Sequence, residues 1–360
     1  MHTLAILSII SAVSGYHLKP HTHIRRGNSS STCFPFNSAT FNNSTTVPDM
    51  SRSDWWCSAE QTYGFLGFSY PIENDCDGEP YSLIESDFAS MKEDFGASLA
   101  RAYLPGCYTD DIWERLIKAG IEHDMGVVFQ VAWPLNGDPD SWWKKIQTSI
   151  LDTLANSSYA DIAPYVVHSI EFGTEPIGDT DGGSYEAFEG YLSDFKEAAK
   201  QYGIPIGISE DWDRPGTMSS DDGSSLGPVG EKIANLSDVV HAHVMPYYHD
   251  DLTEADSWNY IKNQVTWLKA NIDLPVLISE TQWAWAYNDG HAGGHVTGPD
   301  SCDCGEDQYT NYWQNFDDNC EFFKENQVGW FLHAWQQEGT FDMKKDDGSY
   351  AIPNWKPRRC

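Results

Sequence analysis

Short apolar runs alternate with amphipathic stretches over most of the chain. Eight of these runs are rich in β-branched and aromatic residues, a composition typical of buried parallel strands. They cover about 64–70, 98–104, 126–133, 166–175, 205–210, 239–247, 275–280 and 329–335. Between them, apolar residues recur every three or four positions, which predicts helices that include 110–119, 141–155, 185–202, 257–271 and 308–326.

Eight strands, each followed by a helix, predict an α/β fold of the (β/α)8 TIM-barrel type, with one domain over residues 51–360. An open doubly wound sheet is the alternative. That fold usually carries a glycine-rich phosphate turn after its first strand. Because the sequence contains neither G-x-G-x-x-G nor G-x-x-x-x-G-K-[ST], the barrel is favoured.

The first 50 residues differ in composition from the rest. Residues 1–15 hold an apolar run followed by small residues, which predicts a secretory signal peptide too short to span a membrane. Residues 16–50 are rich in Ser, Thr, Asn and His, so we expect a flexible, glycosylated segment. Within it, Arg25-Arg26 is either a processing site or an ordinary exposed pair.

Cysteines and glycosylation sequons indicate the compartment. The chain has 8 cysteines, and N-x-S/T sequons occur at Asn28, Asn42, Asn43, Asn156 and Asn235. Both features are typical of an oxidising, glycosylating route, so we expect a secreted protein, extracellular or in a cell wall. No apolar tail follows Trp355, so we expect no membrane anchor at this end.

The formal net charge is -32 over 360 residues. Such acidity repels phosphate backbones and anionic lipids, so nucleic acid and membrane partners are not expected. A neutral or cationic substrate fits better, although charge of this kind mostly keeps a surface solvated. We expect no metal or cofactor, because the His241/His243 and His291/His295 pairs lack a third ligand and the acidic loop at Asp179 lacks a calcium-loop pattern.

Two of the predicted strands end in a carboxylate, Glu175 and Glu280, which lie 105 residues apart, or about three βα units. The carboxyl ends of barrel strands form the ligand-binding mouth. A glutamate pair there is what glycosidic bond cleavage needs, since one protonates the leaving oxygen and the other attacks the anomeric carbon. Among 54 acidic residues, a surface or capping role for Glu175 is the alternative, but charges are rare at the ends of buried runs, which favours catalysis.

Other residues at the predicted strand ends are candidates for substrate contact. They are aromatic or polar: Tyr70, Arg101, Tyr103, Thr174, Trp212, Tyr247, Trp283 and Trp335. Sugar faces stack on such rings, but tryptophans fit a barrel core equally well. Arg101 either pairs with a carboxylate near the mouth or extends to the rim.

Five motifs, in order along residues 64–335, resemble fungal members of glycoside hydrolase family 17. They are Gly67-Phe68-Ser69-Tyr70-Pro71, Arg101-Ala102-Tyr103 with Cys107, Phe172-Gly173-Thr174-Glu175, Pro246-Tyr247-Tyr248 and Ile278-Ser279-Glu280-Thr281-Gln282-Trp283. That family comprises secreted or cell-wall β-1,3-glucanases and glucanosyltransferases with a (β/α)8 fold. The resemblance implies a monomer acting on a β-glucan polysaccharide or oligosaccharide, with Glu175 as acid/base and Glu280 as nucleophile of a retaining mechanism.

Three positions depart from the family pattern. Thr174 stands where many relatives in the clan have an asparagine that contacts the sugar 2-hydroxyl, Gln282 replaces a usual glycine, and Trp335-Gln336-Gln337 replaces an acidic motif. The departures keep the linkage open. A β-1,3-glucanase-like hydrolase is expected, with a β-1,6-glucanase, a glucanosyltransferase and a non-catalytic carbohydrate-binding wall protein as alternatives.

Overall fold

Eight parallel strands close into a barrel in chain order, with β8 paired to β1. The computed structural model describes residues 32–72, 81–103, 109–132, 142–178, 185–249, 252–287 and 302–360. The strands are β1 Gly64–Pro71, β2 Leu99–Tyr103, β3 Gly126–Val131, β4 Val167–Thr174, β5 Ile206–Glu210, β6 Val240–His243, β7 Val276–Glu280 and β8 Val328–Leu332. The predicted (β/α)8 barrel is confirmed.

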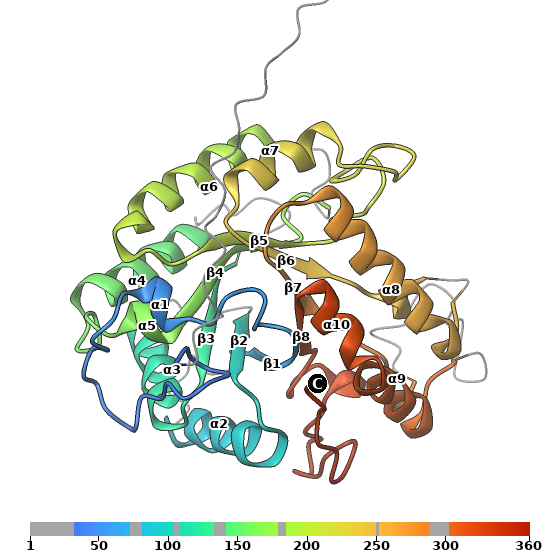
Figure 1. Ribbon diagram of the computed structural model, residues 1–360, viewed down its shortest axis with the longest axis horizontal. Coiled ribbons are helices and arrows are strands. Elements are labelled where there is room, and N and C mark those ends of the chain that lie inside the picture. Colours follow the sequence, from blue (N-terminus) through green and yellow to red (C-terminus); the bar gives the residue numbers. More distant parts are fainter. Residues whose placement is uncertain are drawn as a thin grey trace, which may run out of the picture.

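Helices surround the strands on the outside (Figure 1). The longer ones are α2 Tyr81–Phe95, α3 Asp110–Glu122, α4 Trp142–Asn156, α6 Tyr185–Ala199, α7 Pro228–Leu236, α8 Glu254–Asn271, α9 Glu306–Asp318 and α10 Cys320–Asn326. Two short helices, α1 Arg52–Trp55 and α5 Ala163–Val166, precede β1 and β4. The helix predicted over 308–326 is two helices, α9 and α10, which meet at Asn319.

Every residue of β1, β2, β3, β5, β6, β7 and β8 is buried. Strands covered on both faces have no solvent side, so they appear in a sequence as continuous apolar runs rather than as alternating patterns. Three strands end two or more residues before their predicted ends, β3 at Val131, β6 at His243 and β8 at Leu332. After β6 the chain turns into a short helix, η3 Pro246–Tyr248, at the mouth of the barrel.

Three residues of the N-terminal segment, Cys33, Phe34 and Phe41, are buried, whereas its other described residues up to 50 are exposed or half-buried. Cys33 is bonded to Cys57. Phe34 and Phe41 are buried, and the Phe34 ring stacks on Trp55 at a centroid distance of 5.1 Å. These aromatic contacts remove apolar surface from water, which polar composition alone did not predict.

Several predicted features lie outside the described residues: the signal peptide at 1–15, Arg25-Arg26, Asn28, Cys107, Asp179, His291 and His295. Two further disulfides, Cys302–Cys304 and Cys320–Cys360, are present. A helix with the length and apolar character to cross a bilayer is not found in the described ranges.

Candidate active site

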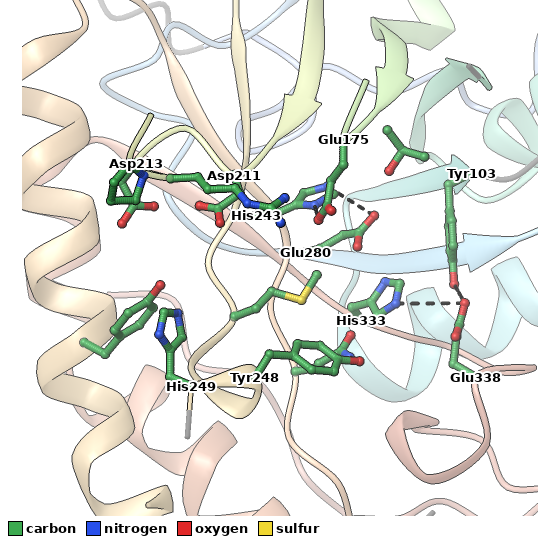
Figure 2. Close-up of a pocket in the computed structure, with 16 residues that line it drawn as sticks. Tyr103, Glu175, Asp211, Asp213, His243, Tyr248, His249, Glu280, His333 and Glu338 are labelled. Atoms are coloured by element: carbon green, nitrogen blue, oxygen red, sulfur yellow. Dashed lines mark hydrogen bonds and ion pairs between the residues drawn. The ribbon is translucent and has the colours of Figure 1, made fainter. Parts of the chain in front are cut away.

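A cavity of about 620 Å³ opens at the carboxyl ends of the strands (Figure 2). Its volume is in the range of ordinary ligand sites. The wall is formed by residues at or beyond the strand ends: Tyr103, Thr174, Glu175, Asp211, Asp213, Arg214, Pro215, His243, Met245, Tyr248, His249, Tyr260, Glu280, Gln282, His333 and Glu338. Thus Glu175, Glu280, Tyr103 and Thr174, all predicted from the sequence, lie on one wall.

Glu175 and Glu280 are joined by one imidazole ring. The His243 Nδ1 atom lies 2.6 Å from Glu175 Oε1, and its Nε2 atom lies 3.3 Å from Glu280 Oε1. Glu280 is the last residue of β7, and Glu175 directly follows β4, where its backbone N–H donates to the Ser209 carbonyl at 2.7 Å. One ring and two short contacts therefore connect the two carboxylates at the mouth of the barrel.

The charge on Glu280 is stabilised from two sides. Burial alone would raise the pKa of this carboxyl, but the His243 and Arg101 cations outweigh that effect and hold the pKa well below its usual value. Arg101 Nη2 lies 2.8 Å from Glu280 Oε1, and its Nε lies 2.7 Å from Glu171 Oε1. Glu280 is therefore ionised at neutral pH, as a nucleophile must be.

His243 is a positioning residue, because it contacts both carboxylates. Burial favours its neutral form, yet Glu280 and Glu175 outweigh burial and raise the pKa of the imidazole well above its usual value. The ring is therefore a cation at neutral pH. Its Nδ1–H faces Glu175 Oε1, and its Nε2 atom lies 2.6 Å from Ser209 Oγ and 3.3 Å from Glu280 Oε1. Sequence reasoning interpreted His243 as an ordinary satisfied histidine, because a contact between three strands leaves no pattern along the chain.

Replacing His243 with alanine should move the acid limb of the kcat/KM profile to higher pH. Glu280 must be ionised to react, and removal of the neighbouring cation raises its pKa. The measurement is the pH dependence of kcat/KM on a cleaved substrate. His249→Ala removes an exposed histidine from the same cavity and should leave the acid limb in place. An unmoved limb in His243→Ala would refute this role.

Five predicted aromatic contacts do not line the cavity: Tyr70, Trp212, Tyr247, Trp283 and Trp335. They fill the core instead. Trp335 packs edge-on against Phe68 at 4.9 Å, and the Trp283 Nε1 atom donates to the Asp303 carbonyl at 2.8 Å. A residue at a strand end can point into the mouth or toward the helices, and these large rings fill the space behind the mouth.

The Arg101 side chain is likewise fully buried and absent from the cavity wall. Its pairing with Glu171 and Glu280 matches the first of the two predicted roles, a carboxylate partner near the mouth. Glu171 also accepts from Gln130 Nε2 at 2.8 Å. Arg101 therefore contacts Glu280, which lines the cavity, and does not line the cavity itself.

The exposed aromatic of the cavity is Tyr248, with 40% of its surface accessible. Its hydroxyl accepts a hydrogen bond from Gln282 Nε2 at 2.7 Å, which fixes the ring beside Glu280. An exposed ring held in place is suited to stacking on a sugar face. The motif Pro246-Tyr247-Tyr248 includes this residue, but the substrate contact predicted from the sequence is the neighbouring Tyr247, which is buried.

Tyr248→Ala and Trp283→Ala should have different effects. Loss of the exposed ring should raise KM by about 3- to 10-fold with little change in unfolding free energy. Loss of the buried Trp283 ring should lower the unfolding free energy by about 3–5 kcal/mol, because it leaves a cavity in the core. Steady-state kinetics and urea unfolding test both. A rise in KM for Trp283→Ala without loss of stability would restore the predicted sugar contact.

One end of the cavity is acidic. Burial and a hydrogen bond to Asp213 raise the pKa of Asp211 to about 9, so the two carboxyls share a proton. Behind them Glu210 accepts from the backbone N–H groups of Ile177 and Gly178 at 2.9 and 3.1 Å. Those two bonds hold the loop that follows Glu175, so Glu210 helps to fix the position of Glu175.

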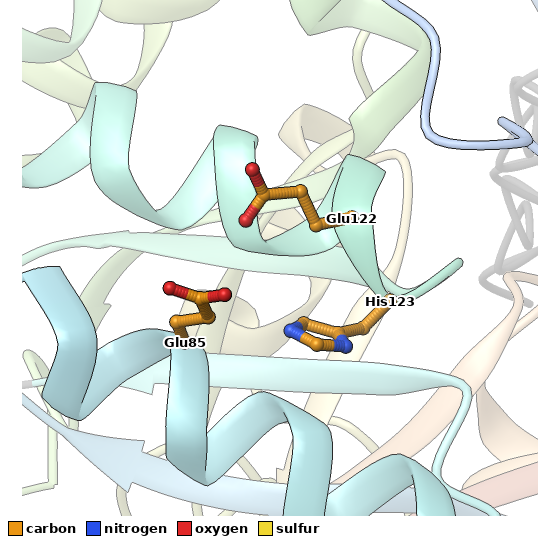
Figure 3. Close-up of side chains that lie close together, drawn as sticks. All are labelled: Glu85, Glu122 and His123. Carbon is orange, nitrogen blue, oxygen red and sulfur yellow. The ribbon is translucent and has the colours of Figure 1, made fainter.

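A separate group of potential ligand atoms lies outside the cavity, where Glu85 on α2 approaches Glu122 and His123 at the end of α3 (Figure 3). Their nearest ligand atoms lie within 4.8 Å of one another. Glu85 is exposed, and Glu122 pairs with Lys118 at 3.4 Å. Exposed charges of this kind are ordinarily solvated, so we assign no role to the group.

Solved structures with the same barrel include enzymes of known activity. An active-site mutant of the Rhizomucor miehei β-1,3-glucanosyltransferase in complex with laminaritriose aligns with a TM-score of 0.61 and 14% identity, covering 82% of this chain and 98% of that one. The glycoside hydrolase family 17 β-1,3-glucanosyltransferase from Rhizomucor miehei aligns with a TM-score of 0.58 and 15% identity, covering 81% and 96%. The barrel of this chain is therefore similar in fold to these two glucanosyltransferases.

Solved structures of other glycosidases align with the barrel as well. A Parabacteroides merdae β-glucuronidase aligns with a TM-score of 0.52 and 12% identity over 82% of this chain and 35% of that one. No protein-family model and no curated protein matches the sequence. Compared with the family 17 pattern, the departures at Thr174 and Gln282 both lie on the cavity wall.

Proposed function

We propose that the protein is a retaining β-glucan hydrolase, with a β-1,3-glucan as the first candidate substrate. The observation that carries the proposal is the pair of carboxylates, Glu175 and Glu280, held by His243 on the wall of an open cavity. The family 17 fold supports it, and so does the neighbour bound to laminaritriose. Secretion, an extracellular or cell-wall location and a monomeric state are part of the same proposal.

The reaction is a double displacement. The ionised Glu280 attacks the anomeric carbon while Glu175 protonates the departing oxygen, and Glu175 then removes a proton from the water that releases the covalent intermediate. When Glu175 gives up its proton, the His243 imidazolium lies 2.6 Å from the new carboxylate and stabilises its charge. Arg101 keeps Glu280 ionised between cycles.

The two ends of the cavity take the two parts of the substrate. Figure 2 places Glu175, His243 and Glu280 between Asp211 and Asp213 at one end and Tyr103 and Glu338 at the other. The ring that bonds to Glu280 lies toward Tyr103, because that tyrosine and Glu338 are close to the nucleophile. The leaving group extends toward Asp211, on the side of Glu210 and the acid/base.

Incubation with laminarin, pustulan and mannan, followed by product analysis, tests the function. Short products from laminarin are expected, and none from Glu280→Ala. Products from pustulan alone would assign a β-1,6 linkage, and products longer than the substrate would indicate a glucanosyltransferase. Binding of a glucan by the wild type without any product would favour a carbohydrate-binding wall protein and reject the enzyme.

A further inference from the structure

The far end of the cavity holds another carboxylate, Glu338, which lies after β8 and directly before the short helix η6 Gly339–Phe341 rather than at the end of a strand. The Tyr103 hydroxyl donates to Glu338 Oε1 at 2.6 Å. The Tyr103 ring is fixed in turn by Arg101, whose guanidinium carbon lies 5.0 Å from the ring centroid. Glu338 is therefore held by a rigid, buried partner on β2.

His333 lies beside this carboxylate and is only 5% exposed. Its Nε2 atom is 4.0 Å from Glu338 Oε1, and within the described part of the chain its buried Nδ1 atom has no hydrogen-bond partner. Burial lowers the pKa of this imidazole despite the nearby carboxylates, so the ring is neutral. A buried N–H without an acceptor is costly, so the single proton belongs on Nε2, facing Glu338.

The 4.0 Å separation is too long for a direct hydrogen bond. A hydroxyl group that bridges the two atoms from the cavity side could accept from His333 Nε2–H and donate to Glu338 Oε1 at the same time. A second buried polar side chain, Gln282, also lines the cavity. It is 3% exposed, and its Oε1 atom has no partner among the described residues. Buried polar atoms without partners call for an explanation, and a bound ligand supplies one.

We propose that Glu338 and His333, with Tyr103 as the positioning residue, bind one hydroxyl group of the sugar ring that becomes attached to Glu280, and that they restrict this ring to neutral sugars. The proposal rests on the glycosidase function proposed above. A uronic acid in this place would bring a third carboxylate beside Glu280 and Glu338, and like charges brought together repel one another.

The cations of the cavity do not offset that repulsion. Arg214 lines the opposite end with Asp211 and Asp213, the Arg101 guanidinium is already bound to Glu171 and Glu280, and the His243 imidazolium already contacts Glu175 and Glu280. The neutral His333 supplies a donor without a charge. The charge pattern at this end therefore favours hydroxyl groups and disfavours carboxylates.

The test compares 2,4-dinitrophenyl β-D-glucopyranoside, its monodeoxy analogues and the corresponding β-D-glucuronide, in the wild type and in Glu338→Gln. The wild type should prefer the glucoside to the glucuronide by at least 100-fold. Glu338→Gln should lower kcat/KM on the glucoside by about 10- to 100-fold. For one monodeoxy analogue, kcat/KM should be much lower than for the glucoside in the wild type but not in Glu338→Gln. The variant already lacks the partner of the missing hydroxyl.

Two variants serve as controls. Tyr103→Phe keeps the ring but removes the hydrogen bond to Glu338, so the same analogue should lower kcat/KM less in this variant than in the wild type. Asp213→Asn replaces a carboxylate at the other end and should leave the analogue pattern unchanged. An equal loss by Glu338→Gln on all analogues, or a wild type that cleaves the glucuronide as fast as the glucoside, overturns the inference alone. A wild type that cleaves no aryl glycoside and no glucan overturns the proposed function, and the inference with it.

Discussion

Glu280→Ala is expected to lower kcat/KM on the cleaved glucan by roughly 10⁴-fold or more, because the variant has no group to form the covalent intermediate. The fold should survive. Glu280 lies at the mouth of the barrel, and Arg101 keeps Glu171 as an ionic partner when Glu280 is removed. The measurement is single-substrate kinetics with thermal unfolding as the check on folding.

Glu175→Ala should lower the rate by about 10²- to 10⁴-fold, the usual contribution of a general acid. Azide separates the two roles. With an activated aryl glycoside, azide should give the β-glycosyl azide in Glu175→Ala, because it attacks the intermediate from the open face. In Glu280→Ala it should give no β-glycosyl azide. Reversed products would exchange the assignments, and full activity in either variant would remove that residue from the reaction.

Arg101→Met should lower the unfolding free energy by about 3–5 kcal/mol and abolish activity, because it leaves Glu171 and Glu280 buried without their cation. Arg101, on β2, is fully buried and contacts both carboxylates. Arg115→Met removes an exposed pair with Asp111 and should change stability by less than about 1 kcal/mol. Urea unfolding at pH 7 measures both.

The sign of the pH dependence follows from the pKa shifts. Burial alone would raise the pKa of Glu171, but Arg101 and His241 bring it to about 2, and the pKa of Glu280 is also lowered. These groups therefore stabilise the wild type above the unfolded value near 4.5, and that contribution is lost as the pH falls through the folded value. In Arg101→Met, burial without the cation raises the pKa of both carboxyls, so the folded variant takes up protons at a pH where the folded wild type does not. The deficit of Arg101→Met should therefore shrink as the pH falls from 7 toward 4. A deficit independent of pH would show that packing, not charge, is lost.

The fold could be predicted because strands buried on both faces leave continuous apolar runs. The catalytic pair could be predicted for a related reason, since Glu280 ends such a run and Glu175 follows one, where a charge stands out. The sequence carries no such signal for the direction in which a side chain at a strand end points. Trp335 and Tyr103 both lie at or near the end of a predicted strand, yet Trp335 fills the core and Tyr103 lines the cavity.

Other parts of the site arise only when distant segments meet. His243 matters because β4 and β7 bring two carboxylates to its two nitrogens. Glu338 belongs to the segment after β8, where no apolar run draws attention to it, and its role depends on contact with Tyr103 on β2. Such contacts between strands far apart in the chain have no periodicity, so local patterns do not reveal them.

Trapping of the covalent intermediate tests the central claim most directly. The wild type would be incubated with a 2-deoxy-2-fluoro-β-glucosyl fluoride, which forms the intermediate faster than water releases it, and then digested and analysed by mass spectrometry. A peptide carrying the sugar on Glu280 is predicted. A sugar on any other residue, or inversion at the anomeric carbon during turnover of a natural glucan, would contradict the account.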